Sequence, residues 1–244
     1  HYLDALRVLL HDGLGHLGQR VRRTTHRSQE AVEQICTVSP RLPERPARFI
    51  ATYNRNRFEA IEPARWPAPG QVFNLLFVGR LAANKGIFDL VEIMRSLQQE
   101  EPGRYRLEFC GEGPGEQALL KGIAAAGLDR LIRVNGQCAT AELARKYTDA
   151  HAVVVPTRSD FEEGTPKVAF EAVLNLRPVV MSAACPALAD VDEAAVEPRV
   201  DDIDDYVRAI RSLSQDPSLY AAKVAAADPC RQKHFDAENS YGNV

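Results

Sequence analysis

The sequence lacks several features that mark whole classes of protein. No apolar run approaches the roughly 18 residues that a membrane-spanning helix needs. There is no C-x-x-C pair, and the five cysteines are an odd, dispersed set, which favours reduced thiols in a cytosolic setting. A net charge of only −3 argues against a general nucleic-acid binder. Internal repeats and low-complexity tracts are also absent.

The first residue is His1 rather than Met, and no signal peptide is visible. We therefore expect a piece of a longer protein that lies in the cytoplasm, with the inner face of the membrane as an alternative location. The 244 residues, of which 45% are hydrophobic, suffice for one large domain or for one domain plus a fragment.

Apolar runs and amphipathic helical patterns alternate from residue 72 onward, which predicts an α/β fold with a doubly wound, Rossmann-like parallel sheet. Strands are expected at residues 72–79, 104–111, 132–136, 151–156, 178–182 and 194–196. Helices are expected around 87–97, from the Gly111-Glu112-Gly113-Pro114 turn to Gly127, at 141–149 with Thr140 as N-cap, at 202–213 and at 217–227.

The N-terminal part reads differently. Residues 1–33 favour a helix, and 34–39 and 47–52 favour short strands. A basic cluster lies in the first of these segments, formed by Arg20, Arg22, Arg23 and Arg27. It suits a solvated helix face better than the alternative, contact with an anionic acceptor or a membrane surface.

One stretch, residues 161–172, joins a buried strand to a helix, and two carboxylates, Glu163 and Glu171, bracket the start of that helix. Pro166 suits the first helical position, because its missing N–H costs nothing there. Free backbone N–H groups at the helix start can bind an anion. An anion site between two acids that can each accept hydrogen bonds from hydroxyls fits a nucleotide sugar.

Glu163, seven residues and Glu171 together resemble the E-x7-E element of retaining GT-B glycosyltransferases of family four, the group 1 glycosyl transferases. The resemblance covers about residues 70–240 and rests on a series of motifs in the family's order. These motifs are Gly79-Arg80 with Lys85-Gly86, Gly111-Glu112-Gly113-Pro114, Val154-Val155-Pro156, the acidic stretch and Arg177-Pro178-Val179-Val180.

The resemblance implies a division of the chain. Residues 67–244 would be the nucleotide-sugar donor-binding domain, the C-terminal half of a GT-B enzyme. Residues 1–66 would be the C-terminal part of a truncated acceptor-binding domain, an incomplete segment whose sheet leaves apolar edges uncovered.

Arg80 and Lys85 follow a buried strand and precede a helix, where the helix dipole disfavours cations, so a functional placement is preferred. There they would clamp the diphosphate and stabilise the charge that builds on this leaving group. By resemblance Glu163 would contact the transferred sugar and Glu171 the ribose. Further donor-binding groups are expected at Gly79, Gly111, Gly113, Cys138, Gly164, Thr165, Lys167 and Val168.

Two positions depart from the family's pattern. Pro166 stands where Gly is frequent, so one expected phosphate contact is missing. Leu176 also replaces a frequent Gly, which should change only a helix end. The nucleobase is expected near residues 136–138, with Leu143 against it.

Other reactive residues favour structural roles. His151 begins a strand and Cys185 lies in a loop. Two D-x-D matches, residues 190–192 and 202–204, lie near helix starts, where capping explains them. We therefore expect no metal and no other cofactor.

The hypothesis is a retaining glycosyltransferase of the hexosyltransferase type that uses a nucleoside-diphosphate sugar. The acceptor, a sugar, lipid or polysaccharide, stays open, as does peripheral membrane contact through the missing domain; no nucleic-acid partner is expected. The alternative is a nucleotide-sugar-binding module without turnover of its own. A third reading is a sugar-nucleotide epimerase or a phosphorylase on the same fold.

Overall fold

The computed structural model describes residues 53–68, 70–161 and 167–236. The chain divides into two compact units, residues 55–231 and residues 1–54 with 232–244. The helix and strands predicted within residues 1–52, and the basic cluster there, lie outside the described residues. The predicted division at residues 66 and 67 concerns the domains of a longer protein and stays a prediction.

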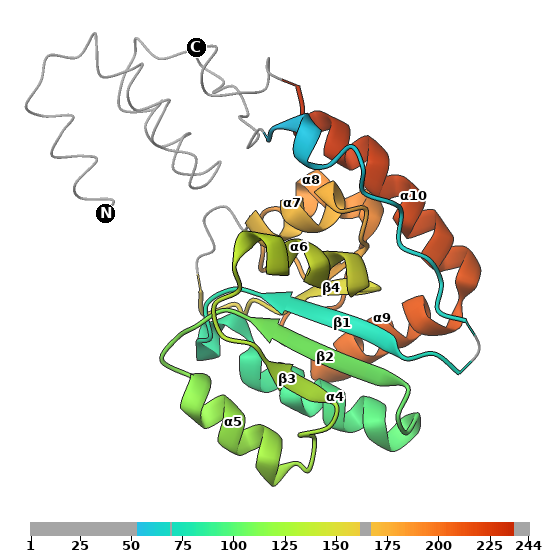
Figure 1. Ribbon diagram of the computed structural model, residues 1–244. Coiled ribbons are helices and arrows are strands. Elements are labelled where there is room, and N and C mark those ends of the chain that lie inside the picture. The colour runs from blue at the N-terminus through green and yellow to red at the C-terminus, as the bar shows by residue number, and fades with distance from the viewer. Residues whose placement is uncertain (1–52, 69, 162–166, 237–244) are drawn as a thin grey trace, which may run out of the picture. The chain divides into compact units, whose positions relative to one another are not determined.

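Residues 55–231 form a six-stranded sheet in which all pairs are parallel and the order is β3-β2-β1-β4-β5-β6 (Figure 1). This confirms the predicted doubly wound α/β class. The strands are β1 (Phe73–Val78), β2 (Tyr105–Cys110), β3 (Ile132–Val134), β4 (Ala152–Val155), β5 (Val179–Met181) and β6 (Ala195–Val196).

Helices cover both faces of this sheet. Helices α4 (Ile87–Glu100), α5 (Glu116–Ala125) and α9 (Ile203–Gln215) lie on one face. Helices α6 (Thr140–Asp149), α7 (Lys167–Leu174) and the short α8 (Leu188–Val191) lie on the other (Figure 1). Helix α10 (Pro217–Lys233) follows α9, and three 3₁₀ turns complete the described elements: η1 (Arg55–Arg57), η2 (Ala83–Lys85) and η3 (Asp192–Ala194).

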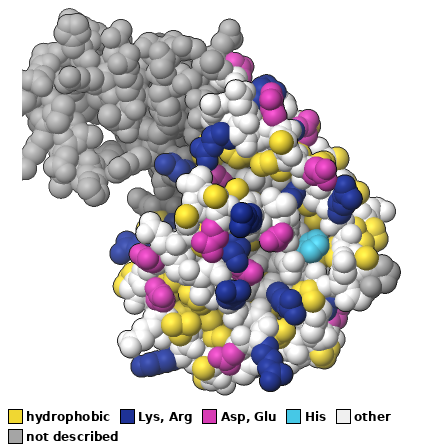
Figure 2. All heavy atoms as spheres, in the orientation of Figure 1, with side chains coloured by type: hydrophobic (Ala, Val, Ile, Leu, Met, Phe, Trp, Pro, Cys, Tyr) yellow, Lys and Arg dark blue, Asp and Glu magenta, His cyan; other side chains and the backbone are white. Residues whose placement is uncertain are grey.

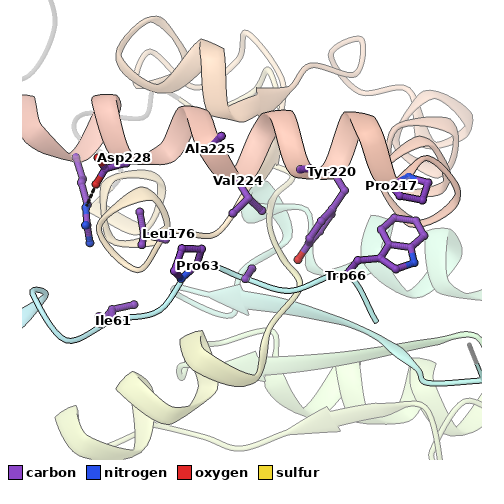
Figure 3. A pocket seen from close by; sticks show the side chains of 12 residues that line it. Ile61, Pro63, Trp66, Leu176, Pro217, Tyr220, Val224, Ala225 and Asp228 are labelled. Carbon is purple, nitrogen blue, oxygen red and sulfur yellow. Dashed lines mark hydrogen bonds and ion pairs between the residues drawn. The ribbon is translucent and has the colours of Figure 1, made fainter. Parts of the chain in front are cut away.

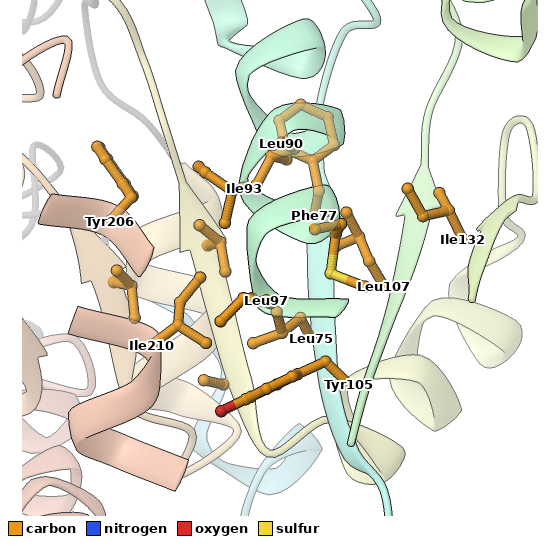
Figure 4. Packing of buried hydrophobic residues seen from close by; sticks show 14 of the residues in the cluster. Leu75, Phe77, Leu90, Ile93, Leu97, Tyr105, Leu107, Ile132, Tyr206 and Ile210 are labelled. Carbon is orange, nitrogen blue, oxygen red and sulfur yellow. The ribbon is translucent and has the colours of Figure 1, made fainter. Parts of the chain in front are cut away.

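The core lies between the sheet and the helices α4 and α9. In β1 and β2 the residues that alternate toward this layer are fully buried, as the period of two in a strand requires. Figure 4 shows these side chains meeting those of the two helices. The cluster includes Leu75, Phe77, Leu107, Leu90, Ile93, Leu97, Tyr206 and Ile210.

The predicted element boundaries need small corrections. Each predicted strand of the described sheet is shorter than expected by one or two residues at one or both ends. Thr140 is not an N-cap: it is the first residue of α6, the N-cap is Ala139, and no side chain caps the helix. Helix α5 begins at Glu116 rather than in the glycine turn, because the loop first hydrogen-bonds to its neighbour: Gly115 N donates to Leu81 O.

Residues 61–66 run beside α10 and pack against it (Figure 3). Trp66 contacts Tyr220 edge to face, with ring centroids 5.6 Å apart. The two segments line an apolar groove of about 530 Å³. Residues 61–66, which lead toward β1, are therefore packed against α10, which follows the last strand of the sheet.

Candidate functional site

The strand order reverses between β1 and β4, because the helix after β1 covers one face of the sheet and the helix after β4 covers the other. In open α/β sheets this is the point at which ligands bind, beyond the carboxyl ends of the strands. The loop after β1, residues 79–86, and the loop after β4, which begins at Pro156, therefore leave the sheet at the same edge.

These two loops are in direct contact. A Cβ atom at Gly86 would lie 2.0 Å from Pro156 O, and Gly86 has a φ of 71°, a left-handed conformation that favours glycine. Arg158 N donates to Asn84 O at 3.1 Å. The loop that carries Arg80 and Lys85 and the loop that leads to α7 are thus held side by side.

The start of the second loop is anchored on both sides. Arg158 Nη1 lies 2.9 and 2.8 Å from the two carboxylate oxygens of Asp89, in the first turn of α4. Ser159 donates from N to Asp201 at 3.1 Å and also from its hydroxyl. The Ser159 hydrogen bonds lower the pKa of Asp201. This anchoring fixes residues 158 and 159 between α4 and the turn at Asp201.

Both predicted cations lie at this edge. Arg80 is exposed, and its side chain forms no ion pair with a described residue. Lys85 lies over the ring of Phe161, with Nζ 4.3 Å from the centroid, a cation–π contact that joins the first loop to the second. The loop after β1 therefore places positive charge beside the loop that leads from β4 to α7.

Glu171 lies within α7, on the side that faces α6. Its Oε2 accepts a hydrogen bond of 3.0 Å from the hydroxyl of Tyr147, which is only 2% exposed. Lys167, the first residue of α7, is exposed, and Val168 is half-buried. Glu163, Gly164 and Thr165 lie outside the described residues, so their predicted contacts stay predictions.

The glycines of the β2–α5 loop serve a close approach between backbones. A Cβ at Gly111 would lie 1.9 Å from Gly79 O, and one at Gly113 would lie 2.3 Å from Leu81 O. Leu81 N donates to Glu112 O at 2.9 Å, so the loops after β1 and β2 pair beyond the strand ends. Gly79 lies at the same contact, and its N donates to Cys110 O at 3.0 Å. These glycines are thus needed for the packing of the two loops, and the approach of a nucleotide to Gly79, Gly111 and Gly113 stays a prediction.

Cys138 lies in the β3–α6 loop, where the nucleobase is predicted. Its Sγ is 3.8 Å from Gly136 O, and Gly136 O accepts a hydrogen bond of 2.8 Å from Gly111 N. Burial raises the pKa of Cys110, whose thiol lies beside that of Cys138. The loops after β1, β2 and β3 are therefore linked in series along the rim.

His151 has the structural role that the sequence favours. Its Nδ1 accepts a hydrogen bond of 2.9 Å from Asn74 N, and its ring stacks on Phe73 at 5.2 Å. Burial, with the charges of Arg177 and Arg104, lowers its pKa to about 4. The histidine stays neutral at physiological pH and lies at the amino end of β4.

Of the two D-x-D matches, only the second caps a helix as predicted. Asp202 caps α9 by accepting from Asp205 N at 2.9 Å, as predicted. The capping predicted for residues 190–192 is wrong: no side chain caps α8 or η3, because Asp190 lies inside α8 and Asp192 Oδ1 accepts from the adjacent Glu193 N. Cys185 is buried. Within the described ranges, no group of three or more His, Cys, Asp or Glu side chains could hold a metal ion.

Sequence reasoning missed the role of Arg177, although the motif that contains it was recognised. Arg177 is 3% exposed and donates to Tyr147 O at 2.7 Å, Thr148 O at 3.0 Å and Glu62 O at 3.0 Å. A cation suits the carboxyl end of α6, whose last carbonyls lack partners within the helix. It thus ties residue 62, α6 and the start of β5 together.

Leu176 takes the left-handed conformation that glycine usually provides after a helix, with φ 55°. Leu176 N donates to Val173 O and Arg177 N to Ala172 O, both at 3.0 Å, which is the Schellman pattern. The departure from the family's glycine thus leaves the helix end intact, and the side chain is buried.

The cavities described away from the carboxyl edge do not contain the candidate site residues. The groove between residues 61–66 and α10 is one (Figure 3). A second, of about 630 Å³, lies over the amino-terminal parts of β1, β2 and β3.

Figure 2 shows basic and acidic side chains interspersed on the face it views. Among the helices of the described part, none is both long and apolar enough to cross a membrane.

Comparison with known proteins gives a consistent picture. A family model described as "Glycosyl transferases group 1" matches residues 59–228. A glycogen synthase of Mycobacterium tuberculosis (strain CDC 1551 / Oshkosh) is 28% identical over 189 residues, which are 72% of this chain and 43% of that protein. The chain therefore spans less than half the length of this curated relative.

Two solved structures show the same fold. One is the C-terminal domain of a group 1 family glycosyl transferase, LpcC, from Francisella tularensis, with a TM-score of 0.59, 19% identity, and coverage of 78% of this chain and 96% of that one. The other is a mutant of TarM from S. aureus in complex with fondaparinux, alpha-GlcNAc-glycerol and UDP, with a TM-score of 0.69, 16% identity, and coverage of 93% and 46%.

Proposed function

Since the chain belongs to the group 1 glycosyl transferases, we propose that it supplies the donor-binding half of a retaining glycosyltransferase that uses a nucleoside-diphosphate sugar. The observation that carries this proposal is the contact between the loops after β1 and β4. It places Arg80 and Lys85 on the same rim as the start of α7.

The diphosphate binds at this rim. Arg80 and Lys85 contribute positive charge from one side, and the free N–H groups at the start of α7 contribute hydrogen bonds from the other. Glu171, further along α7, accepts hydrogen bonds from the ribose hydroxyls. Glu163 contacts the sugar, and the base lies near Gly136 and Cys138. Gly164, Thr165, Lys167 and Val168 complete the phosphate site.

In the transfer step the bond between the sugar's anomeric carbon and the diphosphate oxygen breaks. The acceptor oxygen forms its bond to the same face of that carbon, so the configuration is retained. The acceptor proton passes to the leaving phosphate oxygen, which removes the need for a protein base. The cations stabilise the negative charge that builds on the diphosphate.

The donor is held by these cations without a metal. This part of the proposal has its own test: EDTA should leave the dissociation constant of the bare nucleotide unchanged. A loss of nucleotide binding on chelation would contradict it.

The relatives support a nucleotide as ligand, since the similar TarM structure contains UDP. For this chain we infer a nucleoside diphosphate and leave the base open. The test is calorimetry of the full 244-residue chain with UDP, GDP and ADP, beside a product assay with the matching nucleotide sugars. Binding of one nucleotide in the micromolar range supports the proposal, and no binding of any of the three contradicts it.

The product assay separates turnover from binding alone. We expect this chain by itself to bind the donor without transferring the sugar. The full-length protein should transfer the sugar to a sugar, lipid or polysaccharide acceptor. Binding without transfer by the full-length protein would instead favour the nucleotide-sugar-binding module.

A further inference from the structure

Tyr147 and Glu171 form a hydrogen-bonded pair between two helices on the same face of the sheet. The Tyr147 hydroxyl donates to Glu171 Oε2 at 3.0 Å, and Tyr147 is 2% exposed. The other carboxylate oxygen, Oε1, accepts no hydrogen bond from a described residue. Glu171 itself is half-buried. One oxygen of this acid is thus held by the protein, and the other is left available to a ligand.

The backbone of Tyr147 is held in place by the side chain of Arg177. Arg177 Nε donates to Tyr147 O at 2.7 Å and Arg177 Nη2 to Thr148 O at 3.0 Å. Arg177 is buried and directly follows the left-handed turn that ends α7. The Arg177 side chain, just beyond the end of α7, therefore holds two main-chain carbonyls in the last turn of α6, and Tyr147 of α6 donates a side-chain hydrogen bond to Glu171 of α7.

This closed arrangement has a consequence for ligand binding. A glutamate side chain in solvent samples many rotamers, and fixing one of them costs conformational entropy. A carboxylate that already accepts a tyrosine hydroxyl is held in one orientation before a ligand arrives, so a ligand hydroxyl meets a preorganised acceptor. The Tyr147 hydroxyl also supplies a hydrogen bond to Glu171, a carboxylate that is partly removed from water and would otherwise lose hydration.

We propose that Tyr147, braced by Arg177, is a positioning residue that orients Glu171 toward the ribose of the bound nucleotide. The inference rests on the proposed function and deepens it. It names a source of selectivity for ribose over deoxyribose, and it gives the Arg177-Pro178 motif a role. Tyr147 acts through Glu171 and does not itself contact the nucleotide.

The test compares ribose and deoxyribose nucleotides in calorimetry on the full chain. For wild type and Tyr147→Phe, the dissociation constants of UDP, GDP and ADP are measured beside those of their 2′-deoxy counterparts. We expect Tyr147→Phe to weaken binding of the ribonucleotide roughly tenfold, the usual size for a hydrogen bond to a charged group. Binding of the deoxynucleotide should weaken much less, so the preference for ribose shrinks.

Tyr105→Phe is a matched control. Tyr105 is 1% exposed, and its hydroxyl also donates to a glutamate, Glu101 Oε1, at 3.0 Å, but it lies at the amino end of β2. Both variants lose one buried tyrosine hydroxyl, so their melting points should fall together. Only Tyr147→Phe should change the ratio of the two dissociation constants.

The outcomes separate this inference from the function on which it rests. If wild type binds none of the nucleotides, the proposed function fails and the inference falls with it. If wild type binds and prefers ribose, but Tyr147→Phe keeps that preference, only the inference is overturned. A Tyr147→Phe chain that does not fold would overturn it as well, because the tyrosine would then serve the fold.

Discussion

The amino and carboxyl edges of the sheet differ in how their polar groups are used. At the amino edge, polar side chains are paired with the protein: Arg104 donates to Gln71 O at 2.6 Å and to Ser214 O at 3.0 Å, and the Tyr105 hydroxyl meets both Glu101 and Ser214. At the carboxyl edge, glycine loops pack backbone on backbone, and Arg80 stays exposed.

This difference indicates that side chains serve mainly the fold at the amino edge and are available for ligand binding at the carboxyl edge. The amino edge uses them to satisfy buried groups and to close the core. The carboxyl edge holds its loops by close backbone contacts and by a few side-chain bonds such as Arg158–Asp89. Among the described residues, Arg80 has no ion-pair partner there, and one oxygen of Glu171 accepts no hydrogen bond. Stability and ligand binding should therefore respond to different substitutions at the two edges.

The largest effect should come from a side chain that forces apart the loops after β1 and β4. Gly86→Ala places a Cβ 2.0 Å from Pro156 O in a residue with φ 71°. Left-handed strain and overpacking together should lower the free energy of unfolding by about 3–5 kcal/mol, measured by urea denaturation.

Gly127→Ala is the control for this substitution. Its φ is 66°, but nothing lies within 4 Å of the added Cβ. It should cost only the strain, about 1–2 kcal/mol. Equal losses in the two variants would show that the loops are not in close contact.

Arg80→Ala should spare the fold and weaken the function. Removing an exposed arginine should leave the melting point unchanged, while the dissociation constant of the bare nucleotide rises about tenfold. In the full-length enzyme, turnover should fall about a hundredfold, because the cation acts on the transition state. Arg130→Ala, an exposed arginine near the amino end of β3, should change neither. Near-normal turnover without Arg80 would remove it from the site.

A pH dependence should arise at the amino edge from His151. Burial, then Arg177 and Arg104, lowers its pKa from 6.5 to about 4. The unfolded chain therefore binds the proton first. Stability is fully present above pH 6.5 and is lost as the pH falls from there toward 4.

The loss at His151 should reach about 1–2 kcal/mol, discounted for the partial exposure of the ring. His151→Asn, which keeps an acceptor for Asn74 N but does not titrate, should flatten the urea-denaturation profile across this range. An unchanged profile would assign the pH dependence to other groups.

The smallest effect concerns the left-handed Leu176. Both Leu176→Ala and Leu176→Gly lose a buried side chain, but only glycine relieves the φ of 55°. The glycine variant should therefore be more stable than the alanine variant by about 1 kcal/mol. The opposite order, measured by urea denaturation, would mean that the turn carries no strain.

The sequence predicts the fold well because the strands announce themselves. Apolar runs become β1 and β4, alternation of apolar and charged residues marks β2, and glycine or proline directly follows each of the three strands. Element boundaries depend on backbone geometry that residue types do not fix: Thr140 has the chemistry of an N-cap, but α6 begins one residue earlier than predicted, at Thr140 itself.

The site could be predicted only in part. Residue types and order indicate Arg80, Lys85 and Glu171, because a cation or an acid at a strand-to-helix junction is visible in one dimension. The contacts between loops are not visible there. The approach of Gly86 to Pro156, and the pairing of Tyr147 with Glu171, join residues that are far apart in the sequence, so they depend on the strand order.

The most direct test of the account is a crystal structure of the chain with the nucleoside diphosphate, among UDP, GDP and ADP, that raises its melting point most. We expect the diphosphate between Arg80, Lys85 and the start of α7, with the ribose at Glu171. A nucleotide bound in the groove between residues 61–66 and α10, or over the amino-terminal parts of β1–β3, would contradict the account.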